Sequence, residues 1–384
     1  MGKLIYCKAM NQQSFRSHPF KIGLAVCALV CCAFVLCPAQ AASEQIEIDL
    51  PYGLELYHPP DSLPPYDPLY PLYWSFDLGG IVRDYNFDIK LPQTPSYVPA
   101  CWYEVSEELI ADGLDRAWVE DVFTRLGSCF TETPMKTKLA ELYKIKFGRK
   151  KTAQEEAQAK QPKQTYYRHV ITEKNALRAM NFLETHSEIF AAAEARYGVP
   201  KEVAVSLILV ETDLGSYFGK KQALLNLASM ASSRTKDPFY KHLPKVAGDA
   251  EKEEWMQEVL DKRSAWAYEE LTALLAYSHA NRIDPLELCG SVYGAVGYCQ
   301  FMPSNILRFG VDGSGDGTID LFDPADAIPS LSNYLMRHGW QPGLDEAAQR
   351  KVLLEYNRST AYANTILMMA AELAKRQKKD DTES

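Results

Sequence analysis

A single carboxylate stands at the end of an apolar helix near the middle of the chain. Residues 200–212 read P-K-E-V-A-V-S-L-I-L-V-E-T and carry no charge between Glu202 and Glu211. Val203, Leu207 and Glu211 recur at steps of four and therefore share one helix face. Desolvation at such a position favours the neutral carboxyl, the form that a general acid needs at neutral pH. The helix alone equally allows that Glu211 simply reaches the surface where the helix ends.

An acidic loop further along places oxygen-bearing side chains at regular intervals. Residues 312–323 read D-G-S-G-D-G-T-I-D-L-F-D, with glycine at the sixth position. This is the spacing of a calcium-binding EF-hand loop. The expected ligands are Asp312, Ser314, Asp316, the backbone carbonyl of Thr318, and Asp320. Position twelve is Asp323 where a standard loop has glutamate, and an acidic turn that binds no metal is the alternative.

The segments around these residues have helical patterns. Apolar residues recur at steps of three and four at Leu109, Ile110, Leu114, Trp118 and Val122. Similar patterns cover residues 176–197, 255–282, 325–338 and 345–374. Little of the sequence alternates as strands do. The sequence therefore predicts a mainly α domain over residues 101–384, and this domain has to position both Glu211 and the acidic loop.

The N-terminal 100 residues have two different compositions. Residues 1–41 have the order of a secretory signal peptide, with basic residues, an apolar run and a cleavage site after Ala41. The apolar run of about 16 residues is short of the ~20 that cross a bilayer, so we expect cleavage and export to the periplasm, with a retained membrane anchor as the alternative. Residues 42–100 are rich in Pro and Tyr, which predicts an irregular extended arm.

Composition and charge exclude one class of partner. The chain has 384 residues, of which 47% are hydrophobic, as in an ordinary globular protein. Its net charge is −9, and it has no clustered basic face to neutralise phosphates. We therefore expect no nucleic acid partner.

Four of the nine cysteines remain after the predicted signal peptide is removed: Cys101, Cys129, Cys289 and Cys299. Their spacing does not match a zinc site. Disulfides persist in exported proteins, and four cysteines allow three pairings. Of these we expect Cys101 with Cys129 and Cys289 with Cys299.

Three segments together resemble the B family of lytic murein transglycosylases. Residues 211–219 read E-T-D-L-G-S-Y-F-G, which resembles the family's E-T-x-x-G-x-x-x-G. Residues 290–304 read G-S-V-Y-G-A-V-G-Y-C-Q-F-M-P-S, similar to its S-x-A-G-A-x-G-x-x-Q-F-M-P-S. Residues 356–363 read Y-N-R-S-T-A-Y-A, which resembles Y-N-x-S-x-x-Y-A. The segments follow the family's order, and the similarity extends from about Gly113 to Ala374.

The resemblance implies a lysozyme-like helical catalytic domain with an EF-hand-like loop over residues 312–326. Glu211 corresponds to the catalytic acid and base. The positions that match substrate-contacting residues of the family are Ser291, Gln300, Tyr334, Tyr356, Asn357 and Tyr362. Tyr334 could equally belong to the core. The family's elongated loop closes three residues later than a standard one, so Asp326 is the expected last ligand of a structural calcium ion, with Asp323 second.

The implied reaction needs only one carboxylate. Peptidoglycan glycan strands would be cut between N-acetylmuramic acid and N-acetylglucosamine with formation of a 1,6-anhydro end, whereas glycosidases generally use two carboxylates. Asp213 is the nearest second carboxylate, and on a continued helix it faces away from Glu211. A lysozyme-like hydrolase and an inactive peptidoglycan-binding scaffold, whose arm would recruit cell-wall enzymes, are the alternatives.

Two departures from the family affect the expected cleft. Tyr293 and Cys299 stand where the family has small residues, so the loop before Gln300 is expected to differ in shape. After Trp340 only about a dozen residues precede the last motif, where the family often has a longer insertion. Part of the cleft wall is therefore expected to be missing.

Overall fold

The computed structural model describes residues 97–149 and 165–383, which all belong to the second of the two units into which the chain divides, Tyr85–Ser384. The predicted signal peptide over 1–41 and the predicted arm up to residue 96 lie outside the described residues. Both stay predictions, as does the domain boundary at residue 101.

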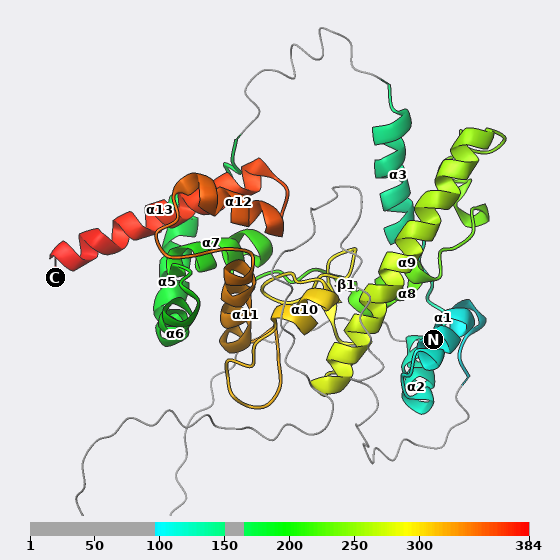
Figure 1. Ribbon diagram of the computed structural model, residues 1–384, viewed down its shortest axis with the longest axis horizontal. Coiled ribbons are helices and arrows are strands. Elements are labelled where there is room, and N and C mark those ends of the chain that lie inside the picture. Colours follow the sequence, from blue (N-terminus) through cyan, green and yellow to red (C-terminus); the bar gives the residue numbers. More distant parts are fainter. Residues whose placement is uncertain (1–96, 150–164, 384) are drawn as a thin grey trace, which may run out of the picture. The chain divides into compact units, whose positions relative to one another are not determined.

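The described residues form an almost entirely helical fold, as the sequence predicts (Figure 1). Its α-helices are α1 (Tyr103–Ala111), α2 (Arg116–Leu126), α3 (Thr133–Phe147), α5 (Glu173–Thr185), α6 (Ser187–Tyr197), α7 (Lys201–Thr212), α8 (Ala223–Ala231), α9 (Ala250–Ala280), α10 (Pro303–Phe309), α11 (Pro324–Arg337), α12 (Glu346–Tyr356) and α13 (Thr360–Glu383). Short 3₁₀ turns cover Ala100–Trp102 and Asp237–Phe239. Two two-residue strands, β1 (Lys221–Gln222) and β2 (Cys289–Gly290), make up the one sheet in these residues.

Helix α7 is surrounded by other helices. It packs against α5, α6, α11 and α13, and every residue from Val203 to Leu209 is buried. A helix that is apolar all round is stable only when it is covered on all sides. It begins after Pro200, whose fixed φ suits a helix start, and it ends where Asp213 turns left-handed. Glu211 therefore lies in the last turn of a helix that is covered on all sides.

Helix α13 lies against α7 and carries the last sequence motif to it. Ile366, Met369 and Leu373 are buried at steps of three and four, which gives α13 one apolar face. The same packing brings Tyr362, in the first turn of α13, to the end of α7. Two motifs about 150 residues apart in the sequence are thus held together by helix packing.

The small sheet joins the other two motifs. β1 and β2 pair antiparallel, with Lys221 opposite Gly290 and Gln222 opposite Cys289. The backbones approach so closely that a Cβ atom on Gly219 would lie 2.1 Å from the carbonyl oxygen of Gly290. The glycine at this motif position is therefore required by the contact between the segment that follows Glu211 and the segment that leads to Gln300.

The predicted continuous helix over 176–197 is in fact two helices. α5 ends at Thr185, and α6 begins at Ser187, with His186 in a non-helical conformation between them. The His186 ring packs against Phe182, with the ring centroids 4.5 Å apart. No helix in the described part of the chain combines the length and the apolar character needed to cross a membrane.

Neither predicted disulfide forms in the structure. Cys101 and Cys129 are exposed free thiols, and Trp102 ties their two segments together instead, since its Nε1 donates to the Gly127 carbonyl at 2.6 Å. Cys299 is a buried free thiol whose Sγ donates to the Ala327 carbonyl of α11 at 3.1 Å. Cys289 is disulfide-bonded, but Cys299 is not its partner.

Candidate active site

The carboxyl group of Glu211 meets one tyrosine from α13. The Tyr362 hydroxyl donates a hydrogen bond of 2.5 Å to Glu211 Oε1. Tyr362 is 2% exposed, so its ring is fixed by packing and the bond has a defined direction. Within the described residues this is the one hydrogen bond to the carboxyl group, and it leaves Oε2 open.

Burial controls the charge of this carboxyl. Loss of solvation raises the pKa of Glu211 from its usual value near 4.5 to about 7, although the bond from Tyr362 acts in the opposite direction. A carboxyl with a pKa near 7 is largely protonated in mildly acidic solution and can donate that proton close to neutral pH. Its environment therefore suits Glu211 to work first as an acid and then as a base.

Three tyrosines continue from Glu211 into the protein. Tyr362 lies parallel to Tyr356 with ring centroids 6.3 Å apart, and Tyr356 meets the edge of Tyr334 at 4.9 Å. The Tyr356 hydroxyl donates to the carbonyl of Cys299. Tyr356 thus fixes the residue directly before Gln300, which links the third motif to the second.

Tyr334 is a core residue, which was one of the two interpretations from the sequence. It is 6% exposed, stacks on His338 at 3.9 Å, and donates its hydroxyl proton to the Glu355 carbonyl at 3.2 Å. It also contacts Phe301 and Phe309. Its contacts support the tyrosine cluster from behind.

Gln300 adopts a backbone conformation that is unusual for a residue with a side chain. Its φ is +47°, in the left-handed region, and its Nε2 donates to the carbonyls of Gly297 at 3.0 Å and Phe218 at 3.4 Å. Strained residues of this kind persist only where their surroundings hold them, and they gather at functional sites. Phe218 belongs to the motif that begins at Glu211, so Gln300 bonds to the segment that follows the carboxylate.

Ser291 and Asn357 have different surroundings. The Ser291 Oγ accepts from the backbone N–H groups of Tyr293 at 3.2 Å and Ala295 at 3.1 Å, so it shapes the loop that leads to Gln300. Asn357 ends α12 and its side chain is exposed, with no hydrogen bond to Glu211. Both lie on segments that reach the Glu211 region, but neither contacts its carboxyl group.

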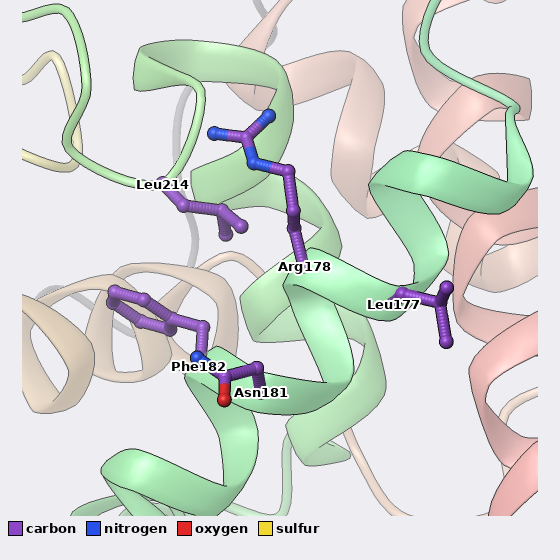
Figure 2. A pocket seen from close by; sticks show the side chains of 5 residues that line it. All are labelled: Leu177, Arg178, Asn181, Phe182 and Leu214. Carbon is purple, nitrogen blue, oxygen red and sulfur yellow. The ribbon is translucent and has the colours of Figure 1, made fainter.

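Arg178 of α5 and Tyr298 contact the turn after Glu211, and the sequence gave no reason to single out either. Helix α7 stops at Thr212 and does not continue through Asp213, whose carboxylate pairs with Arg178 at 2.5 Å instead of meeting Glu211. Tyr298 packs its ring over Gly215, where a Cβ atom would lie only 2.4 Å from the ring. A shallow pocket lies beside this turn, between Leu214 and the residues Leu177, Arg178, Asn181 and Phe182 of α5 (Figure 2).

The acidic loop is organised by its own carboxylates. Asp312 accepts hydrogen bonds from the backbone N–H groups of Gly315, Asp316 and Gly317. Asp326 is 1% exposed, and its two oxygens accept from backbone N–H groups at the two ends of the loop, those of Gly313, Ser314 and Asp320. Asp323 instead caps α11 through Ala325. Asp326, not Asp323, therefore faces the loop interior.

The oxygen-bearing side chains of the loop over residues 312–326 are of the kind that bind a hard cation, although they are not gathered around one point. Burial raises the pKa of Asp320, and the neighbouring carboxylates of Asp316, Asp323 and Asp326 raise it further. Carboxylate, hydroxyl and carbonyl oxygens at this spacing are calcium ligands. Across residues 97–149 and 165–383, no three His, Cys, Asp or Glu side chains are gathered closely enough to hold a metal ion. Closure around calcium would need these carboxylates to turn from the backbone N–H groups toward the ion.

Comparisons with known proteins agree with the resemblance found in the sequence. A family model described as Transglycosylase SLT domain matches residues 98–351, about two thirds of the chain. The match includes the first two motifs and ends inside α12, before the third. The Membrane-bound lytic murein transglycosylase B of Escherichia coli strain K12 is 34% identical over 178 residues, which are 46% of this chain and 42% of that protein. The chain thus aligns with less than half the length of this relative.

Solved structures show the same fold. The lytic transglycosylase SLT35 of Escherichia coli, in complex with calcium, superposes with a TM-score of 0.54 at 22% identity, over 72% of this chain and 93% of that one. SltB1 from Pseudomonas aeruginosa gives 0.53 at 22% identity, over 73% and 100%. SltB3 from Pseudomonas aeruginosa, in complex with NAG-NAM-pentapeptide, gives 0.51 at 19% identity, over 71% and 78%. The predicted mainly α, lysozyme-like transglycosylase fold is confirmed.

Proposed function

The chain belongs to the transglycosylase SLT domain family, and on that premise we propose that it is a lytic transglycosylase of peptidoglycan. It cuts the β-1,4 bond between N-acetylmuramic acid and N-acetylglucosamine and leaves a 1,6-anhydro end. The observation that carries this proposal is the state of Glu211: a desolvated carboxyl with a pKa of about 7, held through one oxygen by Tyr362.

The first step uses Glu211 as an acid. Its protonated carboxyl donates the proton to the glycosidic oxygen, and the bond from this oxygen to C1 of the muramyl sugar breaks. The substrate's own acetamido group supports the positive charge that develops at C1. Oε2 is the oxygen available for this transfer because Oε1 accepts from Tyr362.

The second step uses the same group as a base. The Glu211 carboxylate takes the proton of the muramyl C6 hydroxyl, and the C6 oxygen forms the new bond to C1. Glu211 is protonated again at the end, and no water is consumed. One carboxyl with a pKa near 7 suffices for both transfers, whereas a hydrolase of the common type would need a second carboxylate. Asp213 does not offer one, since its carboxylate pairs with Arg178.

We assign the remaining motif residues to the sugar-binding surface. Gln300 has a strained backbone and lies beside the segment that follows Glu211, which supports a role in contacting the sugar. Asn357 belongs to the same motif as Tyr362, and its exposed side chain is available to bond to a sugar hydroxyl. Ser291, Tyr334 and Tyr356 act less directly, by shaping the loop and by fixing the tyrosine cluster.

We also propose that the loop over residues 312–326 binds a structural calcium ion. Asp326 closes the loop from a buried position, and Asp312 has the hydrogen bonds of a first EF-hand ligand. The calcium complex of SLT35 is consistent with such a site. The ion would fix the segment between Gln300 and Tyr334. Addition of calcium after chelation should raise the Tm of the wild-type protein but not that of an Asp326→Asn variant, and equal Tm shifts would contradict the assignment.

The proposed substrate places the enzyme outside the cytosol. A predicted signal peptide over residues 1–41 supports export to the periplasm, where peptidoglycan is reached. The predicted arm over residues 42–100 stays the candidate for contacts with other cell-wall enzymes.

The test is to incubate the protein and its Glu211→Gln variant with purified peptidoglycan and to weigh the released muropeptides by mass spectrometry. Products lighter by one water than hydrolytic ones, absent with the variant, are expected. Reducing-end products would replace the proposal with a hydrolase. No release by the wild-type protein would favour a binding scaffold.

A further inference from the structure

The turn that follows Glu211 has two adjacent residues in a left-handed backbone conformation. Asp213 has φ +52° and Leu214 has φ +59°, and neither is glycine. Such a conformation is strained for residues with a Cβ atom, and two in sequence persist only if the surroundings hold them there. Hydrogen bonds from the Leu214 N–H to the Ile208 carbonyl at 3.4 Å and from the Gly215 N–H to Thr212 Oγ1 at 3.1 Å hold the turn to α7, and contacts from outside α7 add to them.

Arg178 of α5 makes three of the contacts that fix it. Its Nη1 donates to Asp213 Oδ1 at 2.5 Å, and its Nη2 donates to the Asp213 carbonyl at 3.0 Å and to Ser216 Oγ at 3.2 Å. The guanidinium thus bonds to the backbone of the turn as well as to side chains on either side of Leu214. A planar fork of donors can hold several acceptors in one fixed arrangement, which an ammonium group cannot do.

Arg178 is itself held in place. Asn175 Oδ1 accepts from Nη1 at 3.3 Å, and the Asn175 amide donates to the Val170 carbonyl at 3.0 Å. Leu214 points toward Phe182 and the stem of Arg178 across the shallow pocket on α5 (Figure 2). Polar contacts therefore join α5 to Asp213, and Leu214 faces α5 across the pocket.

A simple surface ion pair does not account for this arrangement. Arg178 and Asp213 are 32% and 53% exposed, and exposed pairs of this kind stabilise proteins little. The contact is distinguished by its position in the chain. Asp213 is the residue that ends α7, two residues after Glu211. Movement of this turn changes how the last turn of α7 presents Glu211 to Tyr362.

We propose that Arg178 is a positioning residue for the reaction: it clamps the left-handed turn at Asp213 and Leu214 and so keeps the Glu211 carboxyl in its buried place beside Tyr362. The proposal rests on the proposed function of Glu211. Without the clamp the turn relaxes, water reaches the carboxyl more easily, and the proton donor is misplaced. A displacement of a catalytic group by about 1 Å lowers the reaction rate on the order of 100-fold.

The test compares Arg178→Met with a matched control, Arg376→Met. Arg376 also pairs with a carboxylate of α5, Glu173, through two bonds, but it lies away from the turn. Folding is checked by circular dichroism, and kcat, KM and the pH dependence are measured on soluble glycan strands. Arg178→Met is expected to lower kcat by about 10- to 100-fold with KM little changed, and to move the alkaline fall in activity to lower pH. The control is expected to match the wild type.

A second variant separates clamping from general destabilisation. Asp213→Gly relieves the left-handed strain at one residue, so the Arg178→Met and Asp213→Gly double variant is expected to recover much of the lost kcat. If Arg178→Met has the same kcat and pH profile as the control, Arg178 does not position Glu211. A Glu211→Gln variant that is inactive in the same assay would leave the proposed function intact in that case. A loss of kcat with no change in the pH profile and no recovery would also overturn the clamp. An inactive wild-type protein would overturn both.

Discussion

Two glutamates, Glu211 at the end of α7 and Glu270 in α9, have opposite hydrogen-bonding environments. Burial raises the pKa of both Glu211 and Glu270 above the usual value. Glu270 is 6% exposed, and its two oxygens accept from the backbone N–H and the hydroxyl of Ser304, each at 2.9 Å. Glu211 accepts one bond, from Tyr362, and keeps an oxygen open.

This difference separates a structural carboxyl from the one that we propose as the catalytic acid. Glu270 fixes the start of α10, at the end of the motif that contains Gln300, and both of its oxygens are occupied by Ser304. Glu211 lacks such a second bond, so part of its desolvation is uncompensated and raises its pKa to about 7. A raised pKa alone would select both residues as candidate acids, and the open oxygen of Glu211 decides between them.

The largest difference between the two glutamates is expected in the rate of glycan cleavage after substitution. Glu211→Gln should lower the rate of glycan cleavage by about 10²- to 10⁴-fold, because the proton donor is lost. Glu270→Gln is nearly isosteric and keeps one acceptor oxygen, so its rate should stay within a few-fold of wild type. Initial rates on the same soluble glycan, with circular dichroism to confirm folding, measure both. Equal losses in the two variants would remove the distinction between the sites.

The effects on stability should rank the two residues in the opposite order, because the substitution of Glu211 should stabilise the protein at pH 8 and that of Glu270 should destabilise it. The neutral form of Glu211 is favoured in the folded state, so its contribution is fully present below pH 4.5 and is lost as the pH rises through about 7. The whole shift corresponds to about 3 kcal/mol above pH 7. Glu211→Gln, which cannot ionise, should therefore be more stable than wild type at pH 8 and similar to it at pH 4.

Glu270→Ala is expected to change the free energy of unfolding in the opposite direction. It leaves the backbone N–H of Ser304 without its partner, which should cost about 1 to 3 kcal/mol. Urea unfolding of both variants at pH 8 would compare the two sites directly. A Glu211→Gln variant that is less stable than wild type at this pH would contradict the uncompensated burial of Glu211.

The smallest effect is expected from Tyr362→Phe. The hydroxyl bond lowers the pKa of Glu211 against the effect of burial, so its removal should raise that pKa further. The alkaline fall in activity should then move to higher pH, with a loss of rate of only a few-fold. A shift to lower pH would show that Tyr362 does more to exclude water than to stabilise the carboxylate.

The sequence predicted those features that depend on local pattern. The apolar run from residue 200 to 212 indicates a helix that is covered by other helices, and Glu211 is at the end of that helix. The sequence was less informative where contacts between distant residues decide the outcome.

Three features show this limit. The clamp of Arg178 on Asp213 joins two residues 35 apart in the sequence, and neither has a distinctive local pattern. Cys299 was expected to pair with Cys289, but its thiol turns toward α11, which periodicity could not reveal. Whether Tyr334 lies in the core or the cleft depended on the helices packed around it.

The role of Glu211 as proton donor is tested most directly by the pH dependence of kcat/KM for the wild-type protein on soluble glycan, since it reports the pKa of the essential acid in the free enzyme. We expect kcat/KM to fall above about pH 7 with the loss of a single proton. A fall that begins near pH 4.5, the usual range of an exposed glutamate, or a constant rate from pH 6 to pH 9, would show that Glu211 is not the proton donor that its burial indicates.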